Sequence, residues 1–174
     1  GRLVHAYLLG TPSAEEFATE ALAKGSGYAG FNLFVGDRES LYWVSNRADS
    51  IVRVEPGVYG VSNGGFDEAW PKVVRVKDAM GAALEDGSVS VEDGLVALAS
   101  RETPADDALP ETGVEQDVER QLGSVFVRSP TYGTRSSTVI AVKADQQVTF
   151  VECVFDEEGE PDGSRGYAFS LDRK

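Results

Sequence analysis

The stretch GVYGVSNGGFDEAWPK, residues 57–72, decides our expectation for the fold. Its beginning, residues 58–61, alternates apolar and small side chains, which predicts a strand. A Ser-Asn-Gly-Gly corner then ends the strand, and Pro71 predicts a helix start, because proline is favoured in the first turn of a helix. The stretch therefore predicts a central strand that carries two polar side chains, Ser62 and Asn63, at its end.

Ser62 and Asn63 allow two interpretations. Polar residues at the end of a strand often belong to a functional site, because a rigid scaffold holds them at the edge of solvent. Serine and asparagine are also common turn formers, since their side chains bond to their own backbone. From spacing alone, the turn-forming role is favoured.

The rest of the chain predicts alternating groups of helices and strands. Helices are expected at 3–9, 14–23, 71–84 and 91–100, and strands at 30–36, 41–46, 51–54, 124–127, 133–143, 148–155 and 166–171. Residues 114–122 predict a short helix or a mobile loop that covers the surface, because they are too polar for a core. Long antiparallel hairpins favour a layered α+β domain over a doubly wound parallel sheet, and we expect one domain over residues 1–174.

Composition excludes several classes of partner. The formal net charge is −13, which opposes binding to nucleic acid and to anionic membrane surfaces. The acidic balance is typical of a salt-loving organism or of an acidic cytoplasmic protein. No run of about 18 apolar residues predicts a membrane span. The chain contains a single cysteine, Cys153, so it has no internal disulfide and we expect a reducing, cytoplasmic location.

Few residues suit metal or cofactor chemistry. His5 is the only histidine, and beside Tyr7 on a helix we expect it to be half-buried, with no role as a ligand. Cys153 is expected to be buried within its strand. No metal cluster is predicted, and haem finds weak support because His5, Cys153 and Met80 are single, scattered candidates. We therefore expect no cofactor.

Arg135 is the other candidate for a binding site. It precedes a β-branched strand and is followed by the hydroxyl residues Ser136, Ser137 and Thr138. An arginine at the entry of a strand can bind a carboxylate or phosphate through its planar guanidinium. A surface salt bridge to one of the many acids is the alternative. The predicted ligand-binding set is Ser62, Asn63, Arg135 and Ser136.

Several blocks of sequence carry a resemblance to a known family: 28–33, 45–47, 56–63 with 70–72, and 132–138 with 148–152. Together they resemble the NRDE family, which is the family of transport and Golgi organization protein 2. The resemblance covers nearly the whole chain. It implies a fold similar to N-terminal-nucleophile hydrolases, in which two antiparallel sheets lie between helical layers. It also implies that Asn63 and Arg135 are the positions similar to the catalytic asparagine and arginine of that fold.

The chain departs from the family pattern at its beginning. Family members start with a Met-Cys strand and carry an Asn-Arg-Asp-Glu tetrapeptide before the point that corresponds to Gly1, and this chain has neither. We therefore expect a fragment covering the C-terminal two-thirds of the family's length, without the nucleophile and with some N-terminal strands missing. No catalytic site is complete, so Asn63 and Arg135 are candidates only.

Three functions follow from this resemblance. The first is small-molecule handling, with haem, a lipid or acyl-CoA as ligand. The alternatives are an N-terminal-nucleophile amidohydrolase whose nucleophile lies upstream, and an inactive structural fragment. Sheet edges left bare by missing strands favour association, so a homodimer is expected.

Overall fold

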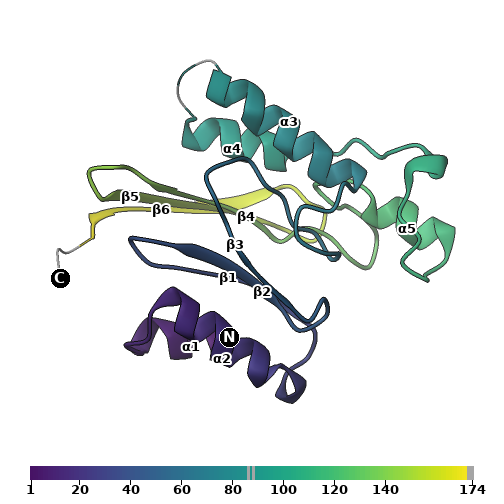
Figure 1. Cartoon of the computed structure of the whole chain (residues 1–174). Helices are drawn as coiled ribbons and strands as arrows, with labels where there is room; N and C mark the ends of the chain where they lie inside the picture. The colour runs from purple at the N-terminus through teal and green to yellow at the C-terminus, as the bar shows by residue number, and fades with distance from the viewer. Residues whose placement is uncertain (86, 88, 172–174) are drawn as a thin grey trace. The chain divides into compact units, whose positions relative to one another are not determined.

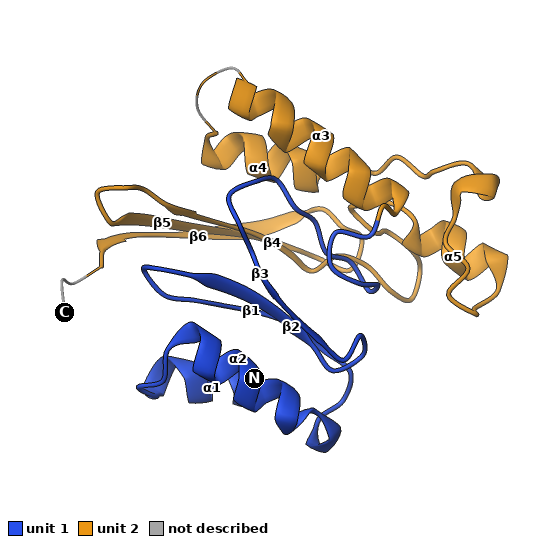
Figure 2. Cartoon of the chain, in the orientation of Figure 1, with its two compact units in different colours: residues 1–68 blue, residues 69–174 orange. Residues whose placement is uncertain are grey.

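The computed structural model describes residues 1–85, 87 and 89–171. These residues form two compact units, Gly1–Glu68 and Ala69–Lys174 (Figure 2). Each unit contains a three-stranded antiparallel sheet with its own helices. The predicted α+β class is therefore confirmed.

The first unit consists of two helices followed by a meander of three strands (Figure 1). Its elements are α1 (Arg2–Leu9), α2 (Ala14–Ala23), a 3-10 turn η1 (Gly25–Gly27), β1 (Asn32–Gly36), β2 (Leu41–Ser45) and β3 (Ser50–Arg53). The predicted capping box is present at the start of α2, where Ser13 accepts from the Glu16 amide and Glu16 accepts from the Ser13 amide. The predicted hairpin and third strand are confirmed as well.

The core of the first unit lies between α2 and one face of its sheet. Ala14, Phe17, Ala18 and Ala21 of the helix pack on Val35, Tyr42 and Val44 of the strands. The strand residues alternate in sequence, which places all three on the same face. His5 is exposed on α1, so the expectation that it is half-buried was wrong.

The segment after β3 packs on the opposite face of this sheet. The central strand that the sequence predicts within this segment does not form. Residues 58–61 form only one isolated bridge, between Val61 and Phe66. The Phe66 ring lies 5.5 Å from the Trp43 ring and 5.2 Å from the Tyr59 ring, between ring centroids. Glycines weaken a strand because they have no side chain to pack, and here aromatic packing holds the segment as an irregular loop.

The second unit consists of three helices followed by a second meander. Its elements are α3 (Pro71–Glu85), α4 (Val91–Leu98), a 3-10 turn η2 (Asp106–Ala108), α5 (Gln116–Leu122), β4 (Ser136–Val142), β5 (Gln147–Phe155) and β6 (Pro161–Ser170). The helices predicted at 71–84 and 91–100 are confirmed. Residues 114–122 contain a helix, although Glu119 within it is only 7% exposed, so this segment is more than a solvated cover.

Two strand predictions in the second unit need correction. Residues 124–127 were expected to be a strand, but the Phe126 amide donates to the Ser100 carbonyl and the Val127 amide to the Thr134 hydroxyl. These bonds to loop partners satisfy the backbone without a sheet. The last strand begins at Pro161, five residues before the predicted start, because its polar first half pairs with β5 through the backbone.

Candidate functional site

The corner that carries Ser62 and Asn63 is fixed by hydrogen bonds within the first unit. The side-chain amide of Asn32 donates to the backbone carbonyls of Ser62 and Gly64, at 3.1 and 3.4 Å. The Asp67 carboxylate accepts from the Gly60 amide at 3.0 Å, and the Asp67 amide donates to the Gly60 carbonyl at 3.0 Å. These bonds connect the backbone of the corner to β1 and close it between Gly60 and Asp67.

The side chains on this corner remain available. Asn63 is exposed and Ser62 is half-buried. Within the described part of the chain, neither side chain forms a hydrogen bond. The turn-forming interpretation required bonds from these side chains to the backbone, and here Asn32 and Asp67 supply that function.

Arg135 and Ser136 lie at the start of β4 in the second unit. The Arg135 guanidinium donates to the Asp156 carbonyl at 2.6 Å, and the Arg135 carbonyl accepts from the Phe155 amide at 2.9 Å. Both contacts are to backbone groups, and among the described residues Arg135 forms no salt bridge. The binding of an anion by Arg135 stays a prediction. Arg135 holds the turn between β5 and β6, while Ser136 is exposed and pairs with Val154 through the backbone.

The structure therefore groups the predicted site residues in two pairs. Ser62 and Asn63 belong to the first unit, and Arg135 and Ser136 belong to the second.

Asn46 ties the helical layer of the first unit to its sheet. Its side-chain oxygen accepts from the Phe31 amide at 2.8 Å. Its side-chain nitrogen donates to the carbonyls of Gly25 and Ala29, at 2.9 and 3.2 Å. One side chain thus bonds these three backbone groups between η1 and β1, and its nitrogen also lies 3.5 Å from the Tyr28 carbonyl.

Lys72 has a comparable role in the second unit. Its ammonium group donates to the Leu122 carbonyl, the last residue of α5, at 2.9 Å. A cation is favourable at the C-terminus of a helix, where carbonyls lack partners. Burial lowers the pKa of Lys72, and the nearby Glu119 carboxylate acts in the opposite direction. Glu119 is itself bonded to the amide and hydroxyl of Thr112.

The second unit contains a hollow of about 520 Å³ that no sequence pattern indicated. Helix α4 forms one side of it and the sheet β4–β6 forms the other; we call it the apolar hollow. The lining residues are Glu92, Leu95, Val96, Ala99, Ser137, Cys153, Phe155, Pro161, Gly163 and Ser164. Cys153 is half-buried there, where full burial was expected.

A row of small residues across the sheet makes this hollow. Ser137 of β4 is the register partner of Cys153, and Cys153 is the partner of Ser164 on β6. Beside the row, α4 comes close to the sheet at Gly94, where a Cβ atom would lie only 2.9 Å from Val139. The helix is therefore anchored at one point, and small side chains leave space below the rest of it. The row can be recognised only when the strand register is known, because its members are far apart in the sequence.

The residues that the structure describes contain no group of three or more His, Cys, Asp or Glu side chains arranged to hold a metal ion. In residues 1–85, 87 and 89–171, no helix combines the length and the apolar character that crossing a membrane requires.

Comparison with known proteins gives the family. A family model described as Transport and Golgi organisation 2 matches residues 1–157. The chain belongs to the Transport and Golgi organisation 2 family. The family resemblance that the sequence blocks predicted is thereby confirmed.

Two of the relatives that the chain matches are mammalian proteins. The chain is 33% identical over 166 residues to the Transport and Golgi organization protein 2 homolog of Bos taurus, which covers 87% of this chain and 60% of the bovine protein. It is 32% identical over 187 residues to the human homolog, covering 98% of this chain and 67% of the human protein. The chain thus spans between 60% and 67% of the length of these relatives.

The sequence blocks on which the family resemblance was based include Asn46 and Lys72. In this chain the side chains of both residues donate to backbone carbonyls, and the Lys72 ammonium group also lies 5.8 Å from the centre of the Trp70 ring.

Proposed function

We propose that this chain handles a small apolar ligand of the lipid or acyl class, bound in the apolar hollow. The observation that carries the proposal is the hollow itself, whose walls are mainly apolar and whose volume of about 520 Å³ is within the range of small-molecule sites. Val96, on its rim, is 67% exposed. Exposed apolar side chains around a concavity are typical of ligand-binding surfaces.

Haem fits this hollow less well than an acyl chain. Cys153 is the only described lining residue of a type that ligates haem iron. His5 is exposed in the first unit, and Met80 is on α3 and is not among the lining residues. The proposal therefore favours a lipid or acyl ligand over haem.

A series of straight-chain alcohols tests the proposal without a charged group. Each buried methylene contributes about 0.8 kcal/mol, which corresponds to about fourfold in affinity. Calorimetric titration with 1-hexanol, 1-octanol and 1-decanol should give dissociation constants that fall about fifteenfold per two methylenes. Equal affinities, or no binding of 1-decanol, would reject the proposal.

Two matched variants locate the binding site. Ala99→Trp fills the hollow from the exposed end of α4, and Ala82→Trp makes the same change at an exposed position of α3 that does not line the hollow. We expect the first to abolish binding of 1-decanol and the second to leave it unchanged. Equal effects would place the ligand elsewhere.

A second candidate function is an N-terminal-nucleophile amidohydrolase within the longer family protein. Its support is the exposed Asn63 side chain on a fixed corner, together with helices that cover one face of each sheet, as in half of an αββα sandwich. Asn63→Ala in a full-length relative should abolish amide hydrolysis, with Asn63→Asp as the conservative control. Unchanged turnover in the alanine variant would reject this candidate.

The remaining proposals concern organisation. We place the chain in one family domain over residues 1–174, in the cytoplasm, and as a homodimer. The edge strands β4 and β6 of the second sheet support the dimer, because unpaired strand edges favour association. Light scattering after size exclusion should give twice the mass of 18.6 kDa, whereas a monomer at high concentration would reject the dimer.

A further inference from the structure

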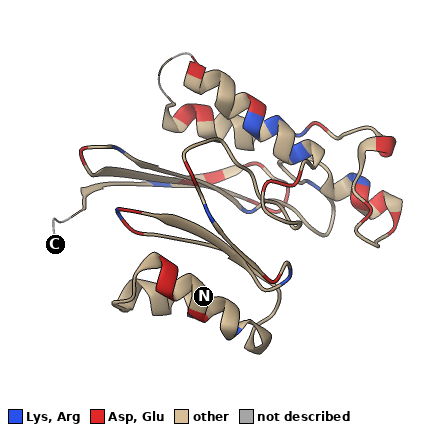
Figure 3. Cartoon of the chain, in the orientation of Figure 1, with Lys and Arg blue, Asp and Glu red and all other residues tan. Residues whose placement is uncertain are grey.

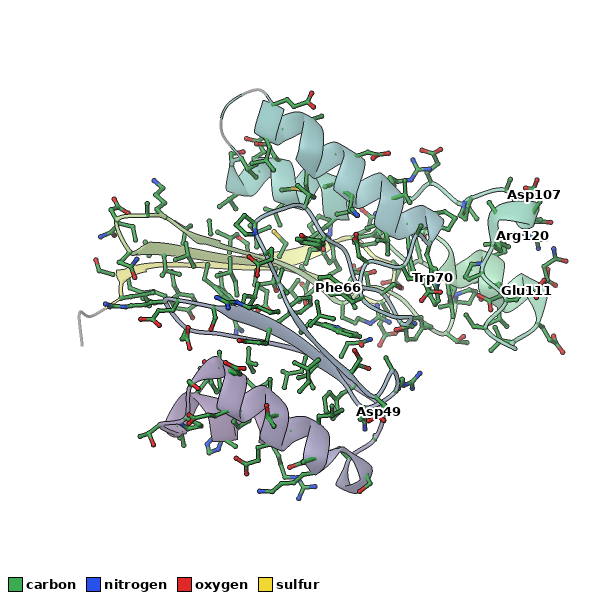
Figure 4. All side chains as sticks on the ribbon, viewed as in Figure 1. Asp49, Phe66, Trp70, Asp107, Glu111 and Arg120 are labelled. Atoms are coloured by element: carbon green, nitrogen blue, oxygen red, sulfur yellow. The ribbon has the colours of Figure 1, made fainter. Side chains whose placement is uncertain are left out.

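A second hollow in the same unit is lined by arginines. It measures about 280 Å³, and we call it the arginine hollow. The lining residues are Arg101, Thr103, Arg120, Gln121, Ser124, Phe126 and Arg128. Arg120 comes from α5, where Figure 4 labels it. Three guanidinium groups at one hollow stand out in a chain of net charge −13, whose acids are spread over both units (Figure 3).

The three arginines differ in how far they are neutralised. Arg120 binds Asp106 through two bonds, at 2.9 and 2.7 Å, and binds Asp117 as well, so its charge is compensated. Arg128 makes one exposed contact with Glu160 at 3.2 Å, a type of pair that contributes little.

Arg101 differs from Arg120 and Arg128 because no acidic side chain that the structure describes neutralises it. Its guanidinium donates to the Gly159 carbonyl at 2.9 Å and lies 5.0 Å from the centre of the Phe126 ring. Within the described part of the chain it has no acidic partner. A guanidinium has five donors in a planar arrangement that matches an oxyanion. One of these donors is used, so most of the group is available to a ligand.

The two hollows are neighbours. Phe126 of the arginine hollow packs edge to face on Phe155 of the apolar hollow, with ring centroids 4.7 Å apart. Ala99, which lines the apolar hollow, is two residues from Arg101 along the chain. An aromatic pair thus separates a space suited to a hydrocarbon chain from one suited to an anion.

We propose that the ligand of this unit is an anionic amphiphile, whose chain occupies the apolar hollow and whose oxyanion head, a phosphate or carboxylate, is bound by Arg101 and Arg128. This inference rests on the function proposed above, because it assigns the head group of the same ligand. It also explains how an acidic protein holds an anion. Short-range donors bind the head where the overall charge would repel it.

Titration with three ligands of one chain length tests the head group. Decyl phosphate should bind at least tenfold more tightly than 1-decanol, because one hydrogen bond to a charged group is expected to raise the affinity by about that factor. Decanoate and decyl phosphate both test the oxyanion, and whichever binds more tightly identifies the head. Inorganic phosphate alone should bind far more weakly than decyl phosphate, because it lacks the chain.

Variants then assign the contact. Arg101→Gln should weaken binding of decyl phosphate about tenfold and leave 1-decanol unchanged. Arg53→Gln, an exposed arginine of the first unit, is the matched charge control and should have no effect. If Arg101→Gln does not fold, as judged by thermal unfolding, Arg128→Gln replaces it, with a smaller expected loss.

The possible outcomes separate this inference from the function on which it rests. If 1-decanol and decyl phosphate bind equally and Arg101→Gln changes neither, the head-group assignment is wrong and the apolar site stands. If inorganic phosphate binds as tightly as decyl phosphate, the two hollows do not share a ligand and the inference is wrong. If neither decyl ligand binds, both proposals are wrong.

Discussion

Replacing Asn46 by alanine should remove the link between the helices and the sheet of the first unit. The substitution removes the hydrogen bonds of the Asn46 side chain to Phe31, Gly25 and Ala29, at 2.8, 2.9 and 3.2 Å. Each such bond contributes about 1 kcal/mol net, and a partner left without a bond costs at least as much. We therefore expect Asn46→Ala to lower the free energy of unfolding of this unit by about 3 kcal/mol.

Tryptophan fluorescence can follow this unit alone. Trp43 is 1% exposed in the first unit, and Trp70 belongs to the second. In a Trp70→Phe background, urea unfolding monitored at Trp43 therefore reports the first unit. The matched control is Asn63→Ala, which removes an exposed asparagine without a described hydrogen bond and should change stability by less than about 0.5 kcal/mol. A loss below about 1 kcal/mol for Asn46→Ala, or equal losses in both variants, would refute the reasoning.

Two further predictions concern single contacts. Hydrogen bonds from the backbone amides of Ala14 and Glu39 hold the pKa of Asp37 below its usual value. The ionised Asp37 carboxylate therefore stabilises the folded state at neutral pH, and this stabilisation is lost below about pH 4. Asp37→Asn should lower stability by about 1 kcal/mol at pH 7 and flatten the acid limb of a stability–pH curve; an unchanged acid limb would contradict this. Gly94→Ala places a Cβ 2.9 Å from Val139 and should destabilise the second unit by about 1–3 kcal/mol in thermal unfolding. Gly81→Ala, where the space around the new Cβ is open, should stabilise the second unit by about 0.5–1 kcal/mol. A stability change of the same sign in both variants would contradict the close contact between Gly94 and Val139.

The parts of the fold that the sequence predicts are those with strong local signals. The Ser13–Glu16 capping box marks the start of α2, and Pro71 marks α3, because these residues act on their own backbone. The failures at 58–61 and 124–127 have a different origin. Tyr59 packs on Phe66, which in turn packs on Trp43 of β2, and the Phe126 amide donates to the distant Ser100 carbonyl.

The candidate site shows the same division. Sequence reasoning placed Ser62 and Asn63 correctly on a glycine-rich corner, but the bonds from Asn32 that fix the corner are 30 and 32 residues distant. The apolar hollow depends on Ser137, Cys153 and Ser164 meeting across the strands. That meeting is a property of register, which no single segment contains.

The reactivity of Cys153 tests the central claim most directly. It is the only cysteine of the chain and lines the apolar hollow, so alkylation by N-ethylmaleimide reports on that space alone. A saturating concentration of decyl phosphate or 1-decanol should slow alkylation at least tenfold, and Ala99→Trp should slow it without ligand. If the rate is unchanged at a concentration where calorimetry shows binding, the ligand does not occupy the apolar hollow.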